Sequence, residues 1–297
     1  MSAVIERPPL EVSAPASHTG LARGAGRPRW RDPVPGFGLT LGLSLAWLGA
    51  VILLPLAALV LRSVDLGLEG WWQLLQSERV QQALWLSFST SFLAAGIASA
   101  VGTLLAWVLV RYRFPGRRLM DALVDLPFAL PTAVAGIALT ALYSGNGWVG
   151  QYLEPQGITI AQRPAGIVLA LVFIGLPFAV RTLQPILEAA TREFEEAAAT
   201  LGASRFTILR RVVFPPLVPA LLTGFSLAFA RGLGEYGSVI FIAGNIPFVS
   251  EIAPLLIVIR LEEYDYAGAT GIATLMLALS FLTLLALNLL QRRARHG

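Results

Sequence analysis

Six long apolar stretches dominate the pattern of hydrophobic and polar positions along the chain. They lie at residues 36–61, 83–110, 122–143, 165–183, 217–243 and 268–290. A helix needs about 20 predominantly apolar residues to cross the hydrocarbon core of a bilayer. Each stretch therefore predicts a membrane-spanning helix. Prolines within the stretches, such as Pro177, do not exclude this, because neighbouring helices can satisfy the freed backbone groups.

The two ends of the chain lack this pattern. Residues 1–35 are rich in Pro, Gly, Ser and Arg without periodicity, which predicts a disordered tail. The first apolar stretch begins only near Gly36, so the beginning of the chain does not read as a cleavable signal peptide. Residues 292–297 form a short basic tail, and residues 36–291 form the predicted transmembrane domain.

The arginines between the stretches indicate the orientation of the chain in the membrane. With six spans, the N-terminal tail, residues 111–118, residues 192–211 and the C-terminal tail fall on one side. That side carries 16 arginines and the opposite side 4. Positive residues are enriched in cytoplasmic loops, so both termini are expected in the cytoplasm.

The composition agrees with a membrane protein and excludes several functions. Of the 297 residues 56% are hydrophobic and 13% are charged, whereas soluble domains carry about 25% charge. There is no Lys, so the chain has no phosphate-binding P-loop. There is no Cys, and His18 and His296 lie in the tails, which argues against thiolate or histidine metal sites. The pI of 9.9 does not point to nucleic acid, because the arginines flank apolar stretches.

Residues 193–215, between the fourth and fifth stretches, are called the EAA segment below. Helix-forming residues follow acids that suit a helix N-terminus, and Gly202 permits a turn. Ser204 can cap a second short helix with Phe206, Leu209 and Val213 on one face. Pro215 and Pro216 are expected to end it. The pattern predicts a helix–turn–helix at the cytoplasmic surface, and an amphipathic helix resting on lipid headgroups is the plainer alternative.

The EAA segment resembles the EAA loop of ABC importer permeases. The loop reads Glu-Ala-Ala, three residues, Gly, nine residues, then an aliphatic-x-aliphatic-Pro ending. The matching positions are Glu196, Ala197, Ala198, Gly202, Val212 and Pro215, and Phe214 stands where Leu is usual. The resemblance implies that this segment, with Phe206 on its apolar face, docks onto a separate ATPase subunit.

A second resemblance covers residues 36–291. The runs 126–136 and 229–247 are similar to the sulfate/thiosulfate permease subunits of the CysT type, and the molybdate permeases are near relatives. The resemblance implies an all-α, polytopic protein of about six transmembrane helices with the type I ABC importer permease fold. It implies sulfate or thiosulfate import across a bacterial inner membrane, with molybdate or tungstate as the alternative.

The same resemblance implies a complex embedded in membrane lipid. Its other members would be a homologous permease of the CysW type, two copies of an ATPase of the CysA type, and an extracytoplasmic sulfate-binding protein. ATP and Mg²⁺ would be bound by the ATPase, and this chain would be a non-catalytic subunit without a cofactor of its own.

Ionisable and proline-flanked positions within the stretches are candidates for the translocation path or its gate: Arg231, Glu235, Tyr236, Pro131 and Thr132. Charged groups at membrane depth usually face a partner or a watery cavity. Arg231 would offer positive potential to a dianion, or would only neutralise Glu235 four residues later. Likewise, Pro131 and Thr132 would line the path or belong to a kinked packing helix.

Two other functional classes compete with a permease subunit. An intramembrane enzyme needs a nucleophile and base, or metal ligands, that converge at depth, and the apolar stretches contain neither Cys nor His. A channel or proton-coupled carrier usually places several acids or histidines in mid-membrane, and few acids occur here.

Overall fold

The computed structural model describes residues 37–190 and 192–296, and the chain divides into two compact units, Met1–Leu53 and Leu54–Gly297. In the first unit, helix α1 (Phe37–Leu48) continues into a π-helical turn, Gly49–Leu53. No residue of either element is buried, although nearly all are apolar. Such a surface needs lipid or protein to cover it. The predicted tail at residues 1–35 lies outside the described residues.

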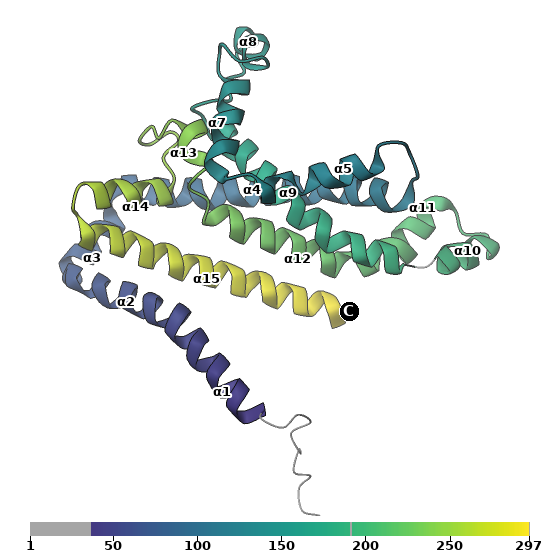
Figure 1. Cartoon of the computed structure of the whole chain (residues 1–297), viewed down its shortest axis with the longest axis horizontal. Helices are drawn as coiled ribbons and strands as arrows, with labels where there is room; N and C mark the ends of the chain where they lie inside the picture. The colour runs from purple at the N-terminus through teal and green to yellow at the C-terminus, as the bar shows by residue number, and fades with distance from the viewer. Residues whose placement is uncertain (1–36, 191, 297) are drawn as a thin grey trace, which may run out of the picture. The chain divides into compact units, whose positions relative to one another are not determined.

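The described residues of the second unit are mostly helical, with loops between the helices, and no strand occurs in them. Figure 1 shows long helices that run along the bundle, with α7 and α8 projecting away from it. The helices are α2 (Leu54–Ser63), α3 (Gly67–Gln76), α4 (Glu78–Arg111), α5 (Arg117–Val124), α6 (Leu126–Ala129), α7 (Thr132–Tyr143), α8 (Gly150–Leu153), α9 (Pro164–Ala189), α10 (Arg192–Thr200), α11 (Arg205–Ile208), α12 (Phe214–Leu233), α13 (Val239–Ala243), α14 (Ala253–Glu262) and α15 (Tyr266–His296).

Five helical stretches in the described residues are long and apolar enough to cross a membrane: Phe37–Gln76, Glu78–Arg111, Pro164–Ala189, Arg205–Leu233 and Tyr266–Gln291. They correspond to five of the six predicted stretches. The remaining one, residues 122–143, is not a continuous helix. It breaks at Asp125 and again at Leu130, which leaves Thr132–Tyr143 as a shorter apolar helix.

Proline explains both breaks in residues 122–143. A proline has no N–H for the helical ladder, and it forces the preceding residue toward an extended conformation. Leu130, before Pro131, has φ −84° and ψ 135°, and Pro127, the second residue of the four-residue helix α6, has no N–H with which to continue the ladder of α5. The predicted single span is therefore three short helices.

The prediction of one helix over residues 217–243 is also wrong at its C-terminal end. Helix α12 ends at Leu233, and α13 begins only at Val239. Three glycines occur between residues 232 and 237, and glycine weakens a helix by about 1 kcal/mol relative to alanine. The intervening turn also has its own hydrogen bonds, since the Glu235 carboxylate accepts from the Ser238 amide at 3.0 Å.

The centre of the bundle is formed by α4, α9 and α12, which pack against one another. On α4 the buried face carries small residues every fourth position, at Ala94, Ala98, Gly102 and Ala106. Small residues let helices approach closely, and within a bilayer this packing contributes more than the exclusion of water.

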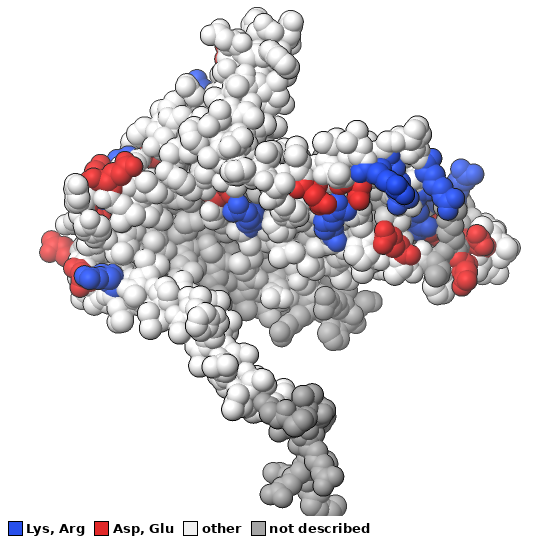
Figure 2. Space-filling model, in the orientation of Figure 1, with Lys and Arg blue, Asp and Glu red and all other residues white. Residues whose placement is uncertain are grey.

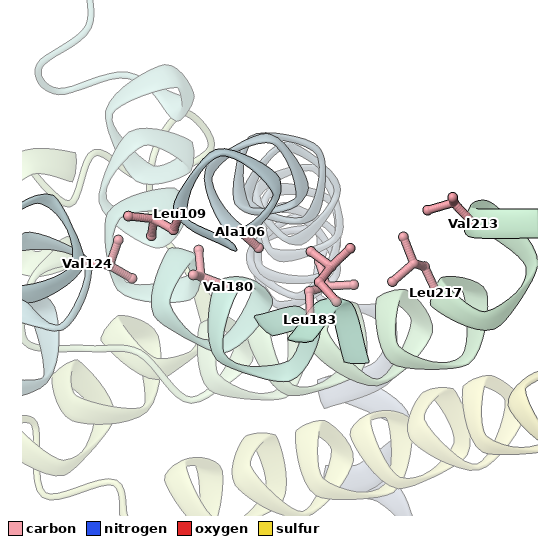
Figure 3. Packing of buried hydrophobic residues seen from close by; sticks show 8 residues of the cluster. Ala106, Leu109, Val124, Val180, Leu183, Val213 and Leu217 are labelled. Atoms are coloured by element: carbon pink, nitrogen blue, oxygen red, sulfur yellow. The ribbon is translucent and has the colours of Figure 1, made fainter. Parts of the chain in front are cut away.

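One apolar cluster lies where the EAA segment joins the bundle. Figure 3 shows side chains of α4, α5, α9 and α12 meeting there, together with Val213 from the end of the EAA segment. The members are Ala106, Leu109, Val124, Val180, Leu183, Leu187, Val213 and Leu217. This cluster anchors the C-terminal end of the EAA segment in the packed core.

Candidate functional site

The EAA segment is a helix–turn–helix, as its sequence predicts. Helix α10 ends at Thr200, and Gly202 adopts φ +83°, a left-handed conformation in which a residue with Cβ is strained. The Ser204 hydroxyl accepts a hydrogen bond from the Thr207 amide at 3.3 Å and so caps α11. The predicted turn and cap are therefore confirmed.

The prediction that Pro215 and Pro216 end the second helix is wrong. Helix α11 passes through a π-helical turn, Leu209–Val213, directly into α12, so helix is continuous from Arg205 to Leu233. The prolines occupy the first turn of α12 after this widened turn. A proline has no N–H for the helical ladder, and the π-helical turn already displaces that ladder immediately before Pro215 and Pro216, so the helix continues through them.

Most of the EAA segment is exposed. Glu196, Ala197 and Pro215 are exposed, and Ala198 and Val212 are half-buried. Among the apolar side chains, Phe206 is 70% and Leu201 88% exposed. The predicted apolar face divides, since Val213 is buried in the core cluster while Phe206 and Leu209 remain exposed.

An apolar pocket of about 280 Å³ lies beside the segment, lined by Ile186, Ala189, Ala190, Phe194, Glu195, Val212, Val213, Pro216 and Leu217. An ion pair fixes the first helix of the segment near this pocket. Glu195 on α10 accepts from Nη2 of Arg111 at 2.5 Å, and Arg111 lies over the Trp107 ring at 5.3 Å. The end of α4 therefore holds α10 in place.

Arg231 and Glu235 pair with each other. Nη2 of Arg231 lies 2.8 Å from the Glu235 carboxylate, which is only 1% exposed, whereas the Arg231 side chain is 38% exposed. Ser238 donates to the same carboxylate through its amide at 3.0 Å and its hydroxyl at 3.1 Å. The buried charge is thus compensated, while part of the Arg231 side chain remains accessible.

The other path candidates lie next to this turn. Gly136 on α7 is placed so close to Ser238 that a Cβ would meet its carbonyl oxygen at 2.3 Å, and Thr132 lies similarly close to Gly237. Tyr236 is half-buried and packs against a core cluster, and Pro131 is exposed immediately before α7. The structure therefore brings together Thr132 and the turn that carries Glu235 and Tyr236.

The EAA segment and this turn lie at opposite ends of α12. Arg231 lies 16 positions after Pro215, which corresponds to about 24 Å at 1.5 Å per helical residue. No direct contact joins the two groups of candidates in the described residues, so any communication between them requires movement of helices.

Sequence reasoning missed a charged cluster around Arg181 on α9. The guanidinium contacts both carboxylates of α5 and its C-cap: Nε and Nη2 reach Asp125 at 2.7 and 2.5 Å, and Nη1 reaches Asp121 at 2.7 Å. Gln184 and the Asp121 carbonyl accept the remaining donors. The sequence did contain a signal for this cluster. Arg181 lies inside the apolar stretch 165–183, and Asp121 and Asp125 are four positions apart in another part of the chain.

The cluster affects the ionisation of Asp121, which lies outside the membrane-spanning segments. Hydrogen bonds from Arg181 and then Gln184 hold the pKa of the Asp121 carboxyl below its ordinary value. A lowered folded-state pKa stabilises the fold at pH values above the ordinary carboxyl pKa, and this contribution is lost as pH falls through the lowered value. The carboxylate is therefore ionised at neutral pH.

Sequence reasoning also missed a second buried carboxylate, Glu251. Arg79 donates to both of its oxygens, at 2.8 and 2.7 Å, although the residues are 172 positions apart. The pair joins the start of α4 to the loop before α14. Among the described residues no group of three His, Cys, Asp or Glu side chains is arranged to hold a metal ion.

Figure 2 shows where the charged side chains lie on one face of the molecule. Arginines gather over α5 and α11, at the end that carries the EAA segment, and smaller groups of both signs lie along the middle of the bundle. The surface between them is largely uncharged, as expected for a bundle surrounded by lipid and protein.

Comparison with known proteins gives consistent results. Residues 98–296 match the family model described as "Binding-protein-dependent transport system inner membrane component". The sulfate transport system permease protein CysT of Synechocystis sp. is 52% identical over 86% of this chain and 89% of its own length. The CysT of Escherichia coli (strain K12) is 47% identical over 89% of this chain and 95% of its own.

The fold also matches a solved structure, that of a bacterial ABC transporter involved in the import of the acidic polysaccharide alginate. The TM-score is 0.72 at 17% identity, with 87% of this chain and 96% of the other covered. At that identity the match supports the fold alone, which is that of ABC importer permeases. The residues that the family model matches include the EAA segment and the path candidates. Together with the close relatives, this match shows that the chain belongs to the inner membrane components of binding-protein-dependent transport systems, among the CysT-type permeases.

Proposed function

We propose that this chain is the membrane-spanning permease subunit of an ATP-driven importer of sulfate and thiosulfate. The observation that carries the proposal is the 52% and 47% identity to two permeases named for sulfate transport, over 86% and 89% of the chain. These relatives favour sulfate over molybdate or tungstate.

In this proposal the chain forms half of the translocation path and binds no cofactor. A homologous permease of the CysW type would form the other half, and two CysA-type ATPase subunits would bind ATP and Mg²⁺. An extracytoplasmic binding protein would deliver the anion; the alginate transporter, for comparison, has been solved in complex with its periplasmic protein. Lipid of the inner membrane would cover the exposed apolar surface of the spans.

The EAA segment would be the part that docks onto the ATPase. Its accessibility supports this role, since Leu201 and Phe206 expose 88% and 70% of their surface. Its attachment supports it as well, because Arg111, the core cluster and continuity with α12 fix both of its helices to the bundle. A small helix can transmit closure of a partner only if it is held rigidly in this way.

The direct test is uptake of labelled sulfate by the complex reconstituted in vesicles with its ATPase and binding protein. We expect ATP-dependent uptake that excess unlabelled thiosulfate suppresses and that unlabelled molybdate suppresses weakly. Preferential suppression by molybdate would assign the chain to that oxyanion instead. Uptake without any ATPase subunit would indicate a carrier.

We propose further that both termini are cytoplasmic, with the EAA segment on the same side. When the short helices α5–α7 are counted together as one crossing of the membrane, 16 arginines lie on that side and 4 on the other, which supports this orientation. A reporter that is active only outside the cytoplasm, fused after Gly297, is expected to give no activity, and the same reporter inserted after Gly157 is expected to be active. Activity at the C-terminal position would overturn the orientation.

A further inference from the structure

The contacts of Arg181 make it a link between helices rather than a ligand for an anion. A guanidinium has five N–H donors. Here they are used by Asp125, Asp121 and Gln184, through four contacts to side chains and one to the Asp121 carbonyl. No donor is left for a sulfate ion unless these contacts break. The group therefore joins α9 to α5 and to the Asp125 turn.

Few other contacts attach α5 and α6 to the bundle. Between residues 117 and 129 only Val124 is buried, and it belongs to the core cluster. The Phe128 ring also meets Phe178 of α9 edge to face, with centroids 5.1 Å apart. The Arg181 contacts are thus the principal polar attachment of this part of the chain.

The cluster is only partly buried, with side-chain exposures of 31% for Arg181, 45% for Asp121 and 48% for Asp125. Exposed charges of this kind are costly against lipid, so this face meets water or another protein. Ion pairs in such surroundings are individually weak. The five contacts of Arg181 form a network that is bidentate at Asp125, which is the exception to this rule, so together they can hold the two helices in register.

The elements joined by Arg181, which are α9, α5 and the Asp125 turn, connect the EAA segment to the turn that carries Glu235 and Tyr236. Arg181 precedes the end of α9 at Ala189, and α10 of the EAA segment begins at Arg192. The Arg111–Glu195 pair fixes α10 to the end of α4, from which the chain turns into α5. Beyond α6, helix α7 begins at Thr132 and rests against the turn at Gly237 and Ser238.

We propose that Arg181 is a positioning residue that couples movement of the EAA segment to helices α5–α7, and through them to the turn that carries Glu235. The inference rests on the proposed import function and adds to it a route between the ATPase side and the path. If α9 moves with the EAA segment, α5 would move with α9, because the Arg181 guanidinium is bonded both to Asp121 on α5 and to Asp125 at the C-cap of α5.

The test compares Arg181→Met with Arg260→Met in the reconstituted complex. Arg260 is a matched control: its side chain is 33% exposed and it also pairs with two carboxylates, Glu263 and Asp265, near α14. The measured quantity is sulfate imported per ATP hydrolysed. We expect at least a tenfold fall for Arg181→Met with ATP hydrolysis retained within about twofold, and an unchanged ratio for Arg260→Met. Partial recovery is expected in the charge exchange Arg181→Asp with Asp125→Arg.

The outcomes separate this inference from the function on which it rests. If the wild-type complex shows no ATP-dependent sulfate uptake, the proposed function fails. If the wild type imports sulfate and Arg181→Met keeps its ratio, only the role of Arg181 fails. If Arg181→Met instead lowers uptake and ATP hydrolysis by the same factor, and the amount of assembled complex falls by that factor too, then Arg181 only stabilises the assembly. That result would overturn the inference as well.

A second measurement does not depend on transport and uses a milder variant, Asp121→Asn, that keeps the side-chain shape. The chain contains no cysteine, so single cysteines can be introduced for spin labels at the exposed Leu119 of α5 and Leu93 of α4. In the assembled wild-type complex, we expect the distance between the labels to change when nucleotide binds. The change should shrink in Asp121→Asn and vanish in Arg181→Met. An undiminished change in both variants would overturn the inference.

Discussion

Replacing Gly202 with valine is expected to abolish ATP-driven uptake while leaving the chain inserted and assembled in the membrane. At φ +83° a residue with Cβ is strained by about 1–2 kcal/mol, and a β-branched residue is the least suited to it. Apart from the glycine and its two neighbours in the chain, no atom lies within 4 Å of the position that a Cβ would occupy, so the effect would not come from a clash with another part of the chain. It would come from a changed angle between α10 and α11 on the surface offered to the ATPase.

Gly157→Val provides the matched control for this experiment. Gly157 has φ +81° and the same empty surroundings, but lies in the loop after α8, far along the chain from the EAA segment. It carries the same backbone strain, and we expect near-normal uptake. Gly202→Asn should retain part of the activity, because asparagine tolerates the left-handed conformation. Normal transport by Gly202→Val would refute the coupling role of the segment.

The second large effect is expected from Arg231→Ala. Removing the arginine leaves the Glu235 carboxylate, 1% exposed, with only the two donors of Ser238. Breaking a buried ion pair from one side typically costs about 3–5 kcal/mol. We therefore expect a marked loss of assembled complex, measured by thermal unfolding in detergent and by recovery of the ATPase with the permease.

The double variant Arg231→Ala with Glu235→Gln separates stability from transport. The glutamine removes the buried charge and can still accept hydrogen bonds from Ser238, so assembly should return close to the wild-type level. If Arg231 offers positive potential to a passing dianion, uptake per assembled complex stays low in this variant. Recovery of wild-type uptake would show that Arg231 serves only to neutralise Glu235.

The EAA segment illustrates how far the sequence could predict local structure. The turn at Gly202 and the cap at Ser204 depend on neighbouring residues, and both appear as predicted. The continuation of helix through Pro215 was missed, since it depends on a π-helical turn whose residues carry no distinctive pattern. That turn is stabilised from outside, where Val213 and Leu217 enter a cluster formed by three other helices.

The sequence by itself determined that this protein is a helical membrane protein and where most spans lie. Long apolar stretches act locally, so the helices that they form can be read along the chain, whereas the prolines at 127, 131 and 215 had effects that the sequence did not predict. Only the tertiary structure decided which charged groups meet. Arg181 pairs with Asp125, which is 56 positions away in the sequence, and Arg79 pairs with Glu251, which is 172 positions away. Such pairs depend on how helices pack against one another. The sequence of a helix can show which of its faces is packed, but it does not show which other helix packs against that face.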